Sequence, residues 1–322
     1  MARILVTGGS GFIGTNLVAH YRLSGDQVIN LDIAPPRNPE HAAFWRKTDI
    51  LDRQALIQAV IEADPEIILH MAARTDLRGK CIADYAANTD GISNLIQALQ
   101  EVQNVRRIIF ASSMLVCSIG YRPKGEMDYC PTTAYGESKV VGERLIREEA
   151  RKLPWIIVRP TSIWGPWFST PYKEFFIAVQ RGFYMHPWGR RIHRSYGFVM
   201  NSTMQLDRLT QVKGASLIGR TLYLADYEPI ELKNWATTIQ RELGARPVKE
   251  IPLWLLKIAA SAGDLLKCLG YSSLALNSFR LNNLLSEMIQ DTDMLRAACG
   301  NLPYSMEQGV QITCDWLRQN PA

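Results

Sequence analysis

The first half of the chain alternates short apolar runs with longer segments in which apolar residues recur every three or four positions. Short β-branched apolar runs indicate strands, and the longer periodic segments indicate helices. The expected strands are Arg3–Thr7, Val28–Asp32, Phe44–Asp49, Glu66–Met71, Arg106–Ser112 and Trp155–Arg159. The expected helices are Phe12–Leu23, Arg53–Ala63, Ile82–Gln100 and Ala134–Arg151. This alternation predicts an α/β fold with a doubly wound parallel sheet covered by helices on both faces.

The pattern changes after about residue 160. Pro, Gly, Trp and Tyr become dense between Pro160 and Gly189, and helical spacing dominates further along the chain. The expected helices there are Leu232–Leu243, Pro252–Leu269, Leu276–Ser286 and Ser305–Gln319. We therefore expect a sheet domain at residues 1–160 and a smaller, mostly helical region at residues 161–322, with the chain crossing back to the first domain.

Composition narrows the class of protein. The 322 residues are 47% hydrophobic and 21% charged, which is typical of a globular chain rather than a disordered one. The net charge of +5 is consistent with an anionic ligand, and without a long Lys/Arg run we expect no nucleic-acid partner. The six cysteines include no CxxC pair, so we expect no metal site and reduced thiols. A signal-peptide pattern and membrane-spanning apolar runs are also missing, which predicts a cytoplasmic protein.

The segment Thr7–Gly14 carries a glycine pattern between an expected strand and an expected helix. Its glycines, Gly8, Gly11 and Gly14, allow a tight turn and the close approach of backbone amides to a phosphate. The helix that follows, beginning with Phe12 and Ile13, adds free N–H groups and a partial positive charge. In this context the pattern predicts a dinucleotide site of the Rossmann type.

Acidic residues at the ends of the next two strands extend this expected site. Asp32 lies where a carboxylate binds the adenosine ribose hydroxyls and repels a 2′-phosphate, which favours NAD over NADP. The nearby Arg37 weakens that exclusion slightly. Asp49 and Ile50 end the third strand, where they are candidates for the edge of the adenine, although a solvated loop is the alternative.

Tyr135 and Lys139 are four residues apart at the start of an expected helix, so their side chains share one face. A free tyrosine has a pKa near ~10, and a nearby ammonium lowers it. The pair then suits proton transfer in alcohol and ketone chemistry. Ser113, at the end of the fifth expected strand, can place a hydroxyl on the same substrate oxygen.

These pieces together resemble the extended short-chain dehydrogenase/reductases, the family of nucleotide-sugar epimerases and dehydratases. The matching segments are TGGSGFIG (7–14), LD (31–32), HMAA (70–73), Asn88, ASS (111–113), YGESK (135–139) and RPTSIWGP (159–166). The resemblance implies a bound NAD, a nucleotide-sugar substrate held by the second region, and a homodimer formed through the helices at about 82–101 and 134–151.

The resemblance also implies roles for single residues. Tyr135 is the acid/base, Lys139 holds the nicotinamide ribose, and Ser113 hydrogen-bonds the reacting oxygen. Arg194 meets the substrate phosphate, with a plain surface arginine as the alternative. Further contacts are implied for Ala72, Ala73 and Asn88 with the cofactor and for Ser162 with the substrate.

Departures from the family pattern narrow the reaction. Met114-Leu115 stands where sugar dehydratases carry an Asp-Glu pair, so water elimination lacks its acid. The remaining reactions are 4-epimerisation, which we favour, and oxidation or ketone reduction of a sugar. Ser162 and Met200-Asn201 replace an Asn and an acidic pair of the family, and partly resemble the hydroxysteroid dehydrogenases. A non-catalytic NAD-binding protein is the third alternative.

Two further segments have both a structural and a functional interpretation. The aromatic residues of the second region are expected to be core packing rather than ligand contacts: Trp164, Trp167, Tyr172, Phe175 and Phe176. The amphipathic segment 252–267 could lie on a membrane surface, as in a membrane-associated reductase of apolar alcohols. We expect instead a helix buried against the main domain, because the segment has only two lysines.

Overall fold

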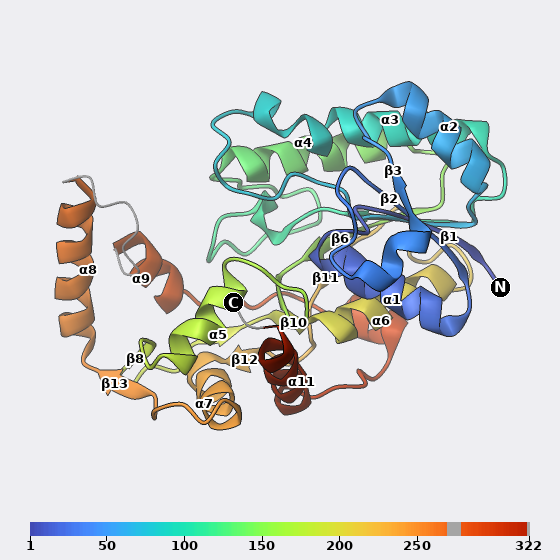
Figure 1. The fold of residues 1–322 in the computed structure, drawn as a ribbon. Helices are drawn as coiled ribbons and strands as arrows, with labels where there is room; N and C mark the ends of the chain where they lie inside the picture. The colour runs from blue at the N-terminus through green and yellow to red at the C-terminus, as the bar shows by residue number, and fades with distance from the viewer. Residues whose placement is uncertain (269–277, 321–322) are drawn as a thin grey trace. The chain divides into compact units, whose positions relative to one another are not determined.

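The computed structural model describes residues 1–268 and 278–320 and divides the chain into two compact units (Figure 1). The first unit comprises Met1–Ile163, Gly197–Tyr227 and Asp291–Pro303. The second comprises Trp164–Tyr196, Glu228–Gln290 and Tyr304–Ala322. The chain therefore passes between the units several times, and the short strands β7 (Ser162–Trp164) and β10 (Tyr196–Phe198) lie at two of these passages.

The first unit is built on a seven-stranded sheet with the order β11-β6-β5-β4-β1-β2-β3, and every pair is parallel. Its strands are β1 (Arg3–Thr7), β2 (Gln27–Asp32), β3 (Trp45–Lys47), β4 (Ile67–His70), β5 (Arg107–Ala111), β6 (Trp155–Pro160) and β11 (Thr221–Leu224). The predicted doubly wound α/β fold is confirmed. The strand order reverses between β1 and β4, and ligands bind beyond the carboxyl ends of the strands at such a point.

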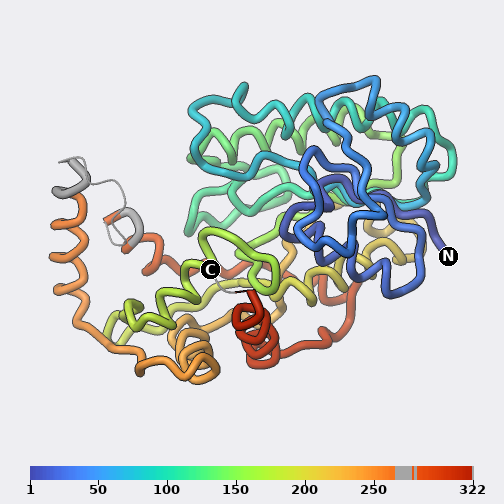
Figure 2. Tube along the Cα trace, in the orientation of Figure 1, coloured from blue at the N-terminus to red at the C-terminus, as the bar shows by residue number. Residues whose placement is uncertain are grey.

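Helices cover both faces of this sheet, as Figures 1 and 2 show. One face is covered by α1 (Phe12–Ser24), α6 (Val199–Gln211) and α10 (Asp293–Cys299), which share one apolar core with the strands. The other face is covered by α2 (Arg53–Ala63), α3 (Asp90–Ala98) and α4 (Ala134–Glu149), which share a second core. The buried side chains of these two layers hold the carboxyl ends of the strands in place, where the candidate site lies.

The segment Ile82–Gln100 is not the single helix that its periodicity predicts. A 3₁₀ segment covers Ile82–Asn88, and α3 starts only at Asp90. The backbone of Tyr85 is non-helical, with φ −116° and ψ 37°. Its hydroxyl donates to the Asp76 carbonyl at 2.7 Å and accepts from the Gly79 N–H at 3.1 Å. These contacts with the preceding loop hold Tyr85 at the break in the helix, and the periodicity of the segment carries no sign of them.

The second unit is organised around aromatic side chains. Its helices include α5 (Tyr172–Gln180), α7 (Leu232–Glu242), α8 (Leu253–Cys268), α9 (Ser278–Leu285) and α11 (Met306–Gln319). Strand β8 (Met185–Pro187) pairs with β13 (Lys249–Ile251), and β9 (His193–Arg194) pairs with β12 (Ile230–Glu231). Trp164 and Phe176 are fully buried, and the Phe175 ring stacks on Trp235 with centroids 4.7 Å apart. These aromatic residues form a packed core, as expected.

Helix α8 departs from the prediction that it is a buried helix. Leu256 and Ala260 pack against Leu281 of α9, but Trp254 and Ile258 are both 60% exposed. One face of α8 is therefore apolar and open to solvent. The last residue of the predicted helix Pro252–Leu269 and the first two residues of the predicted helix Leu276–Ser286 lie outside the described residues. Within the described part of the chain, no helix has both the length and the apolar character that crossing a bilayer requires.

Candidate active site

The glycine loop after β1 is packed too closely for side chains. Gly8 has φ +72°, and a β-carbon built on it would lie 2.5 Å from the Ala72 backbone nitrogen. A β-carbon on Gly14 would lie 2.1 Å from the Gly8 carbonyl oxygen. Gly11 is the N-cap of α1, and no side chain caps that helix end. The first turn, with Phe12 and Ile13, therefore presents its backbone N–H groups as a pyrophosphate site requires, and the loop fits a dinucleotide.

Asp32 is held at the carboxyl end of β2 by the same loop. Its carboxylate accepts the Ser10 N–H at 3.0 Å and the Ala34 N–H at 3.0 Å. Each oxygen keeps a free lone pair, so the group can still accept ribose hydroxyls. Burial lowers the pKa of the nearby Arg37, and the Asp32 charge opposes that shift. Asp32 thus stands at the position expected of a ribose-binding acid, with Arg37 close by.

Asp49 and Ile50 have different environments at the end of β3. The Asp49 carboxylate is exposed and accepts the Leu51 N–H at 2.9 Å, while Ile50 is buried and packs where a β-carbon on Gly91 would stand. The Asp49 side chain has the accessibility that an adenine contact needs. Such a contact remains a prediction for both residues.

Ala72 and Ala73 lie in the loop after β4, and Asn88 holds this loop. The Asn88 amide donates to the Arg74 carbonyl at 3.0 Å and to Ser138 Oγ at 2.9 Å, and its oxygen accepts the Arg74 N–H at 2.9 Å. Both hydrogens of the amide group are thus engaged by the protein. Asn88 joins the loop to helix α4, so any effect on the cofactor acts through the position of the loop.

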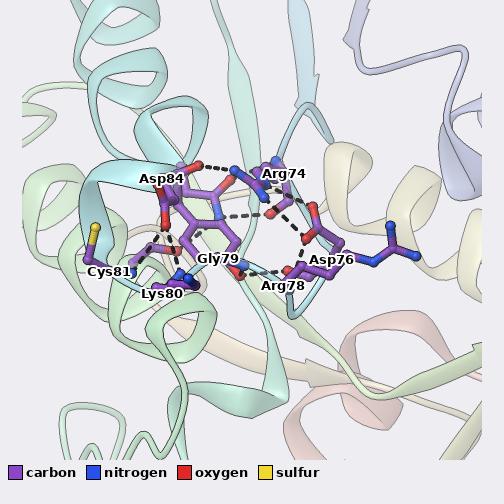
Figure 3. Close-up of polar contacts among 10 residues, drawn as sticks. Arg74, Asp76, Arg78, Gly79, Lys80, Cys81 and Asp84 are labelled. Carbon is purple, nitrogen blue, oxygen red and sulfur yellow. Dashed lines mark hydrogen bonds and ion pairs between the residues drawn. The ribbon is translucent and has the colours of Figure 1, made fainter. Parts of the chain in front are cut away.

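The rest of this loop is tied together by its own polar groups (Figure 3). The Arg74 guanidinium donates to Asp76 at 2.8 Å and to the Asp84 carbonyl at 2.7 Å. The Asp84 carboxylate accepts the Lys80 N–H at 2.7 Å. These bonds fix the segment that carries Tyr85, whose ring packs on Tyr135 with centroids 5.9 Å apart. This support for Tyr135 is not visible in the sequence, because it depends on contacts between neighbouring loops.

The structure brings Ser113, Tyr135 and Lys139 together. Thr133 caps α4 through the Gly136 N–H at 3.0 Å, which places Tyr135 in the first turn and Lys139 one turn later. Tyr135 is 7% exposed, and the Ser113 side chain lies near enough to its hydroxyl to favour the phenolate. Lys139 Nζ donates to the Ala111 carbonyl at 2.9 Å, at the end of β5. A hydroxyl pair and an ammonium therefore meet at the carboxyl edge of the sheet.

Burial dominates the electrostatics of these groups. It raises the pKa of Tyr135, and the hydrogen bond from Ser113 opposes the shift. Burial also lowers the pKa of Lys139 to about 8, with Glu143 opposing, and lowers that of His70 to about 3, where the Lys139 charge adds to the effect. The expectation that Lys139 lowers the pKa of Tyr135 is not met in this arrangement. Desolvation of the phenolate is the largest cause of the raised pKa, and the Lys139 ammonium, whose Nζ donates to the Ala111 carbonyl, is not among the groups that shift it.

A buried ion pair lies beside the site, and sequence reasoning missed it. Arg159 of β6 and Glu143 of α4 are 2.8 Å apart, with side chains 1% and 0% exposed. Glu143 also accepts the Ser112 hydroxyl at 2.6 Å and the Tyr129 hydroxyl at 2.9 Å. The carboxylate therefore fixes the residue next to Ser113. Ser112 itself is occupied by this network, which leaves Ser113 as the hydroxyl that meets Tyr135.

The two predicted substrate contacts belong to different units. Ser162 is buried at the start of β7 in the first unit. Arg194 lies in the second unit, where its guanidinium donates to the Asn283 carbonyl and, at 3.0 Å, to the Ser286 carbonyl at the end of α9. The Arg194 side chain thus has a structural role within the second unit, and its binding of a substrate phosphate remains a prediction.

Comparisons with known proteins identify the family. A sequence model of the NAD dependent epimerase/dehydratase family matches residues 4–184, more than half of the chain. A 3 beta-hydroxysteroid dehydrogenase/Delta 5-->4-isomerase of Mycobacterium tuberculosis is 30% identical over 264 residues, which are 76% of this chain and 70% of the relative. The chain therefore belongs to the NAD dependent epimerase/dehydratase family, and NAD is its cofactor.

Other similar proteins span nearly the whole chain. An undecaprenol-linked N-acetylglucosaminyl-diphosphate 4-epimerase of Escherichia coli O157:H7 is 23% identical, covering 97% of this chain and 94% of the relative. The solved structure of a UDP-glucuronic acid 4-epimerase from Bacillus cereus has a TM-score of 0.74 at 18% identity, over 98% of this chain and 99% of that one. A UDP-glucose 4-epimerase from Thermotoga maritima has a TM-score of 0.75 at 20% identity, over 99% of both chains. These structures share the fold.

Proposed function

We propose that this protein is an NAD-dependent epimerase that inverts the C4 hydroxyl of a sugar carried on a diphosphate. The observation that carries the proposal is the placement of Ser113 beside Tyr135, with Lys139 one helical turn away, at the edge of a loop that fits NAD. The missing acid at Met114-Leu115 disfavours elimination of water. Besides NAD, inversion needs no group other than these side chains.

The residues divide the proton chemistry between them. Tyr135 takes the proton of the substrate hydroxyl and later returns it, while the Ser113 hydroxyl donates a hydrogen bond to the same oxygen. Bound NAD supplies a reversible acceptor for the hydride of the same carbon. Because burial raises the pKa of Tyr135, positive charge must lie near the phenol when it accepts the proton. Lys139, on the same helix face, is the side chain that we propose supplies it, with its Nζ released from the Ala111 carbonyl.

Turnover of defined sugars tests the proposal. Purified protein is incubated without added cofactor with UDP-, GDP-, dTDP- and CDP-sugars and with a polyprenyl-diphosphate sugar, and products are read by NMR. We expect a C4-inverted product, with turnover about 10²–10⁴-fold lower in Tyr135→Phe. Tyr121→Phe, which removes only a hydroxyl bonded to Asp128, is the matched control and should retain turnover.

A dehydrogenase of an apolar alcohol is the second candidate. The Mycobacterium tuberculosis relative, a hydroxysteroid dehydrogenase by name, matches at higher identity than the Escherichia coli epimerase. Ser162 and Met200-Asn201 agree with that comparison. Reduction of added NAD by an alcohol, with no inverted sugar, would establish this candidate instead.

Assembly and location belong to the same proposal. We propose a homodimer formed through the surfaces of α3 and α4, in the cytoplasm. Light scattering coupled to gel filtration measures the mass in solution. A monomer at micromolar concentration would contradict the dimer.

A further inference from the structure

One face of α8 is exposed and apolar. Leu256 and Ala260 fill the contact with α9, and Figure 1 shows these two helices side by side. On the rest of the helix, Trp254 and Ile258 are each 60% exposed and Leu255 is 41% exposed. Residues four apart lie on one side of a helix, so Trp254 and Ile258 form a continuous apolar strip. Apolar surface gathered in this way marks an interaction site.

A second exposed tryptophan, Trp188, directly follows strand β8, which pairs with β13 just before the start of α8. In the pairing of β8 with β13, Pro187 lies opposite Ile251, and the Trp188 N–H donates to the Ile251 carbonyl at 2.9 Å. Helix α8 starts two residues after Ile251. Trp188 is 69% exposed. Trp188 and Trp254 therefore extend one apolar surface across the junction of the strands and the helix.

Cations without partners border this surface. Arg190 and Arg191 follow Trp188, and Lys257 lies on α8 between Trp254 and Ile258. All three are exposed, and their side chains make no hydrogen bond or ion pair with the described residues. The acids near the strand pair are already engaged. Glu250 pairs with Lys233 at 2.6 Å, and Glu231 accepts the Lys233 and Asn234 N–H groups at the start of α7.

We propose that this surface, defined by Trp188, Arg190, Arg191, Trp254, Leu255, Lys257 and Ile258 and named the α8 face, docks on an anionic membrane surface. Tryptophan side chains favour the interface between lipid and water, and amphipathic helices lie in that interface. Unpaired arginine and lysine side chains are attracted to acidic headgroups. The α8 helix has 16 residues and lies on the bilayer without crossing it.

The charges favour a membrane over a second copy of this chain. A symmetric dimer places the same surface on both sides of the contact. Arg190, Arg191 and Lys257 would then face the same cations. Nearby, Glu250 is paired with Lys233, and Glu231 leaves a single negative charge against the three cations. An anionic lipid surface matches both the apolar and the cationic parts of the α8 face.

Sedimentation with vesicles tests the proposal without reading turnover, so its outcome is independent of the proposed reaction. Full-length protein is mixed with vesicles of phosphatidylcholine alone or with added phosphatidylserine. We expect binding to the anionic vesicles that high salt weakens. The double variant Trp254→Glu/Ile258→Glu should reduce partitioning about tenfold or more, as should Arg190→Glu/Arg191→Glu. Leu23→Glu, at a position 84% exposed in the first unit, is the matched control and should bind as wild type.

Three results would overturn the proposal. The first is no sedimentation with anionic vesicles, and the second is equal sedimentation of wild type and Trp254→Glu/Ile258→Glu. The third is a wild-type dimer in light scattering that this variant converts to a monomer, because a second copy would then cover the α8 face. Unchanged circular-dichroism melting of each variant excludes unfolding as the cause of lost binding, and none of the substituted side chains is buried.

Discussion

Gly136 lies so close to Leu115 that a β-carbon built on the glycine would stand 2.3 Å from the Leu115 carbonyl oxygen. This contact brings the first turn of α4 against the short turn that follows Ser113, and so places Tyr135 beside Ser113. The backbone there cannot accept a methyl group without moving one of the two segments.

The substitution Gly136→Ala should therefore separate Tyr135 from Ser113. A displacement of about 1 Å at a reacting centre costs about 10²-fold in rate, so we expect a turnover loss of that order with NAD still bound. Steady-state turnover and an NAD titration measure the two effects. Gly125→Ala, where no atom lies within 4 Å of the added carbon, is the control. Equal turnover in both variants would show that the close contact has no catalytic role.

Asp32 should set the preference for NAD over NADP. In Asp32→Asn the charge that repels a 2′-phosphate is lost, along with one acceptor for the Ser10 or Ala34 N–H. We expect weaker NAD binding and tighter NADP binding, measured by titration of both cofactors. Asp49→Asn, at the neighbouring strand end, should leave the ratio of the two affinities unchanged. An unchanged ratio in Asp32→Asn would place the discriminating group elsewhere.

Removing one partner of the buried ion pair between Glu143 and Arg159 should strongly lower the free energy of unfolding. Arg159→Leu leaves the Glu143 carboxylate buried without its cation, and such losses cost about 3–5 kcal/mol of unfolding free energy. Glu143→Leu/Arg159→Leu removes both charges and should be more stable than Arg159→Leu. Urea unfolding of wild type, Arg159→Leu, Glu143→Leu and the double variant measures these differences. A double variant as unstable as the sum of its single variants would contradict a coupled pair.

Asp226 should make stability depend on pH near neutrality. Burial raises its pKa to about 7, although its carboxylate accepts the Phe198 N–H at 3.1 Å and the Asn201 amide at 3.0 Å. An unfolded aspartate titrates near ~3.9, so between about pH 4 and 7 the folded protein holds one more proton than the unfolded chain. This residue therefore lowers stability by up to about 1.4 kcal/mol per unit of rising pH in that window.

The variant Asp226→Asn has no such titration and keeps an acceptor for the Phe198 N–H. Its unfolding free energy should fall less steeply than that of wild type from pH 4 to 7 and should exceed it above pH 7. Urea unfolding at a series of pH values shows the difference between the two curves. Parallel curves would mean that Asp226 is ionised throughout.

The sheet domain was predictable because its signals are local. Helix α2 starts and ends at its predicted residues, Arg53 and Ala63, and six strands of the sheet lie within about two residues of their predicted ends. The seventh strand, β11 (Thr221–Leu224), was missed because it lies after residue 160, beyond the alternation of strands and helices that predicted the other six. It joins the sheet only through pairing with β6.

The site was predictable in part, for the same reason. The patterns of Tyr135 with Lys139 and of the glycine loop were predictable, because each depends only on spacing within one short segment. Glu143 reads as one more charge on the surface of a polar helix, and only its contact with Arg159 from β6 reveals that it is buried. The exposure of Trp254 was likewise hidden, because an apolar helix face looks the same in sequence whether it is covered or open.

The central claim is that the hydride taken from the sugar returns to the sugar. A substrate labelled with deuterium at C4, mixed with an equal amount of unlabelled substrate of another mass, tests it by mass spectrometry after turnover without added NAD. We predict inverted product in which the deuterium stays in the molecules that carried it, and no NADH in solution. Deuterium found in released NADH, with oxidised substrate in place of inverted sugar, would contradict the epimerase and establish a dehydrogenase.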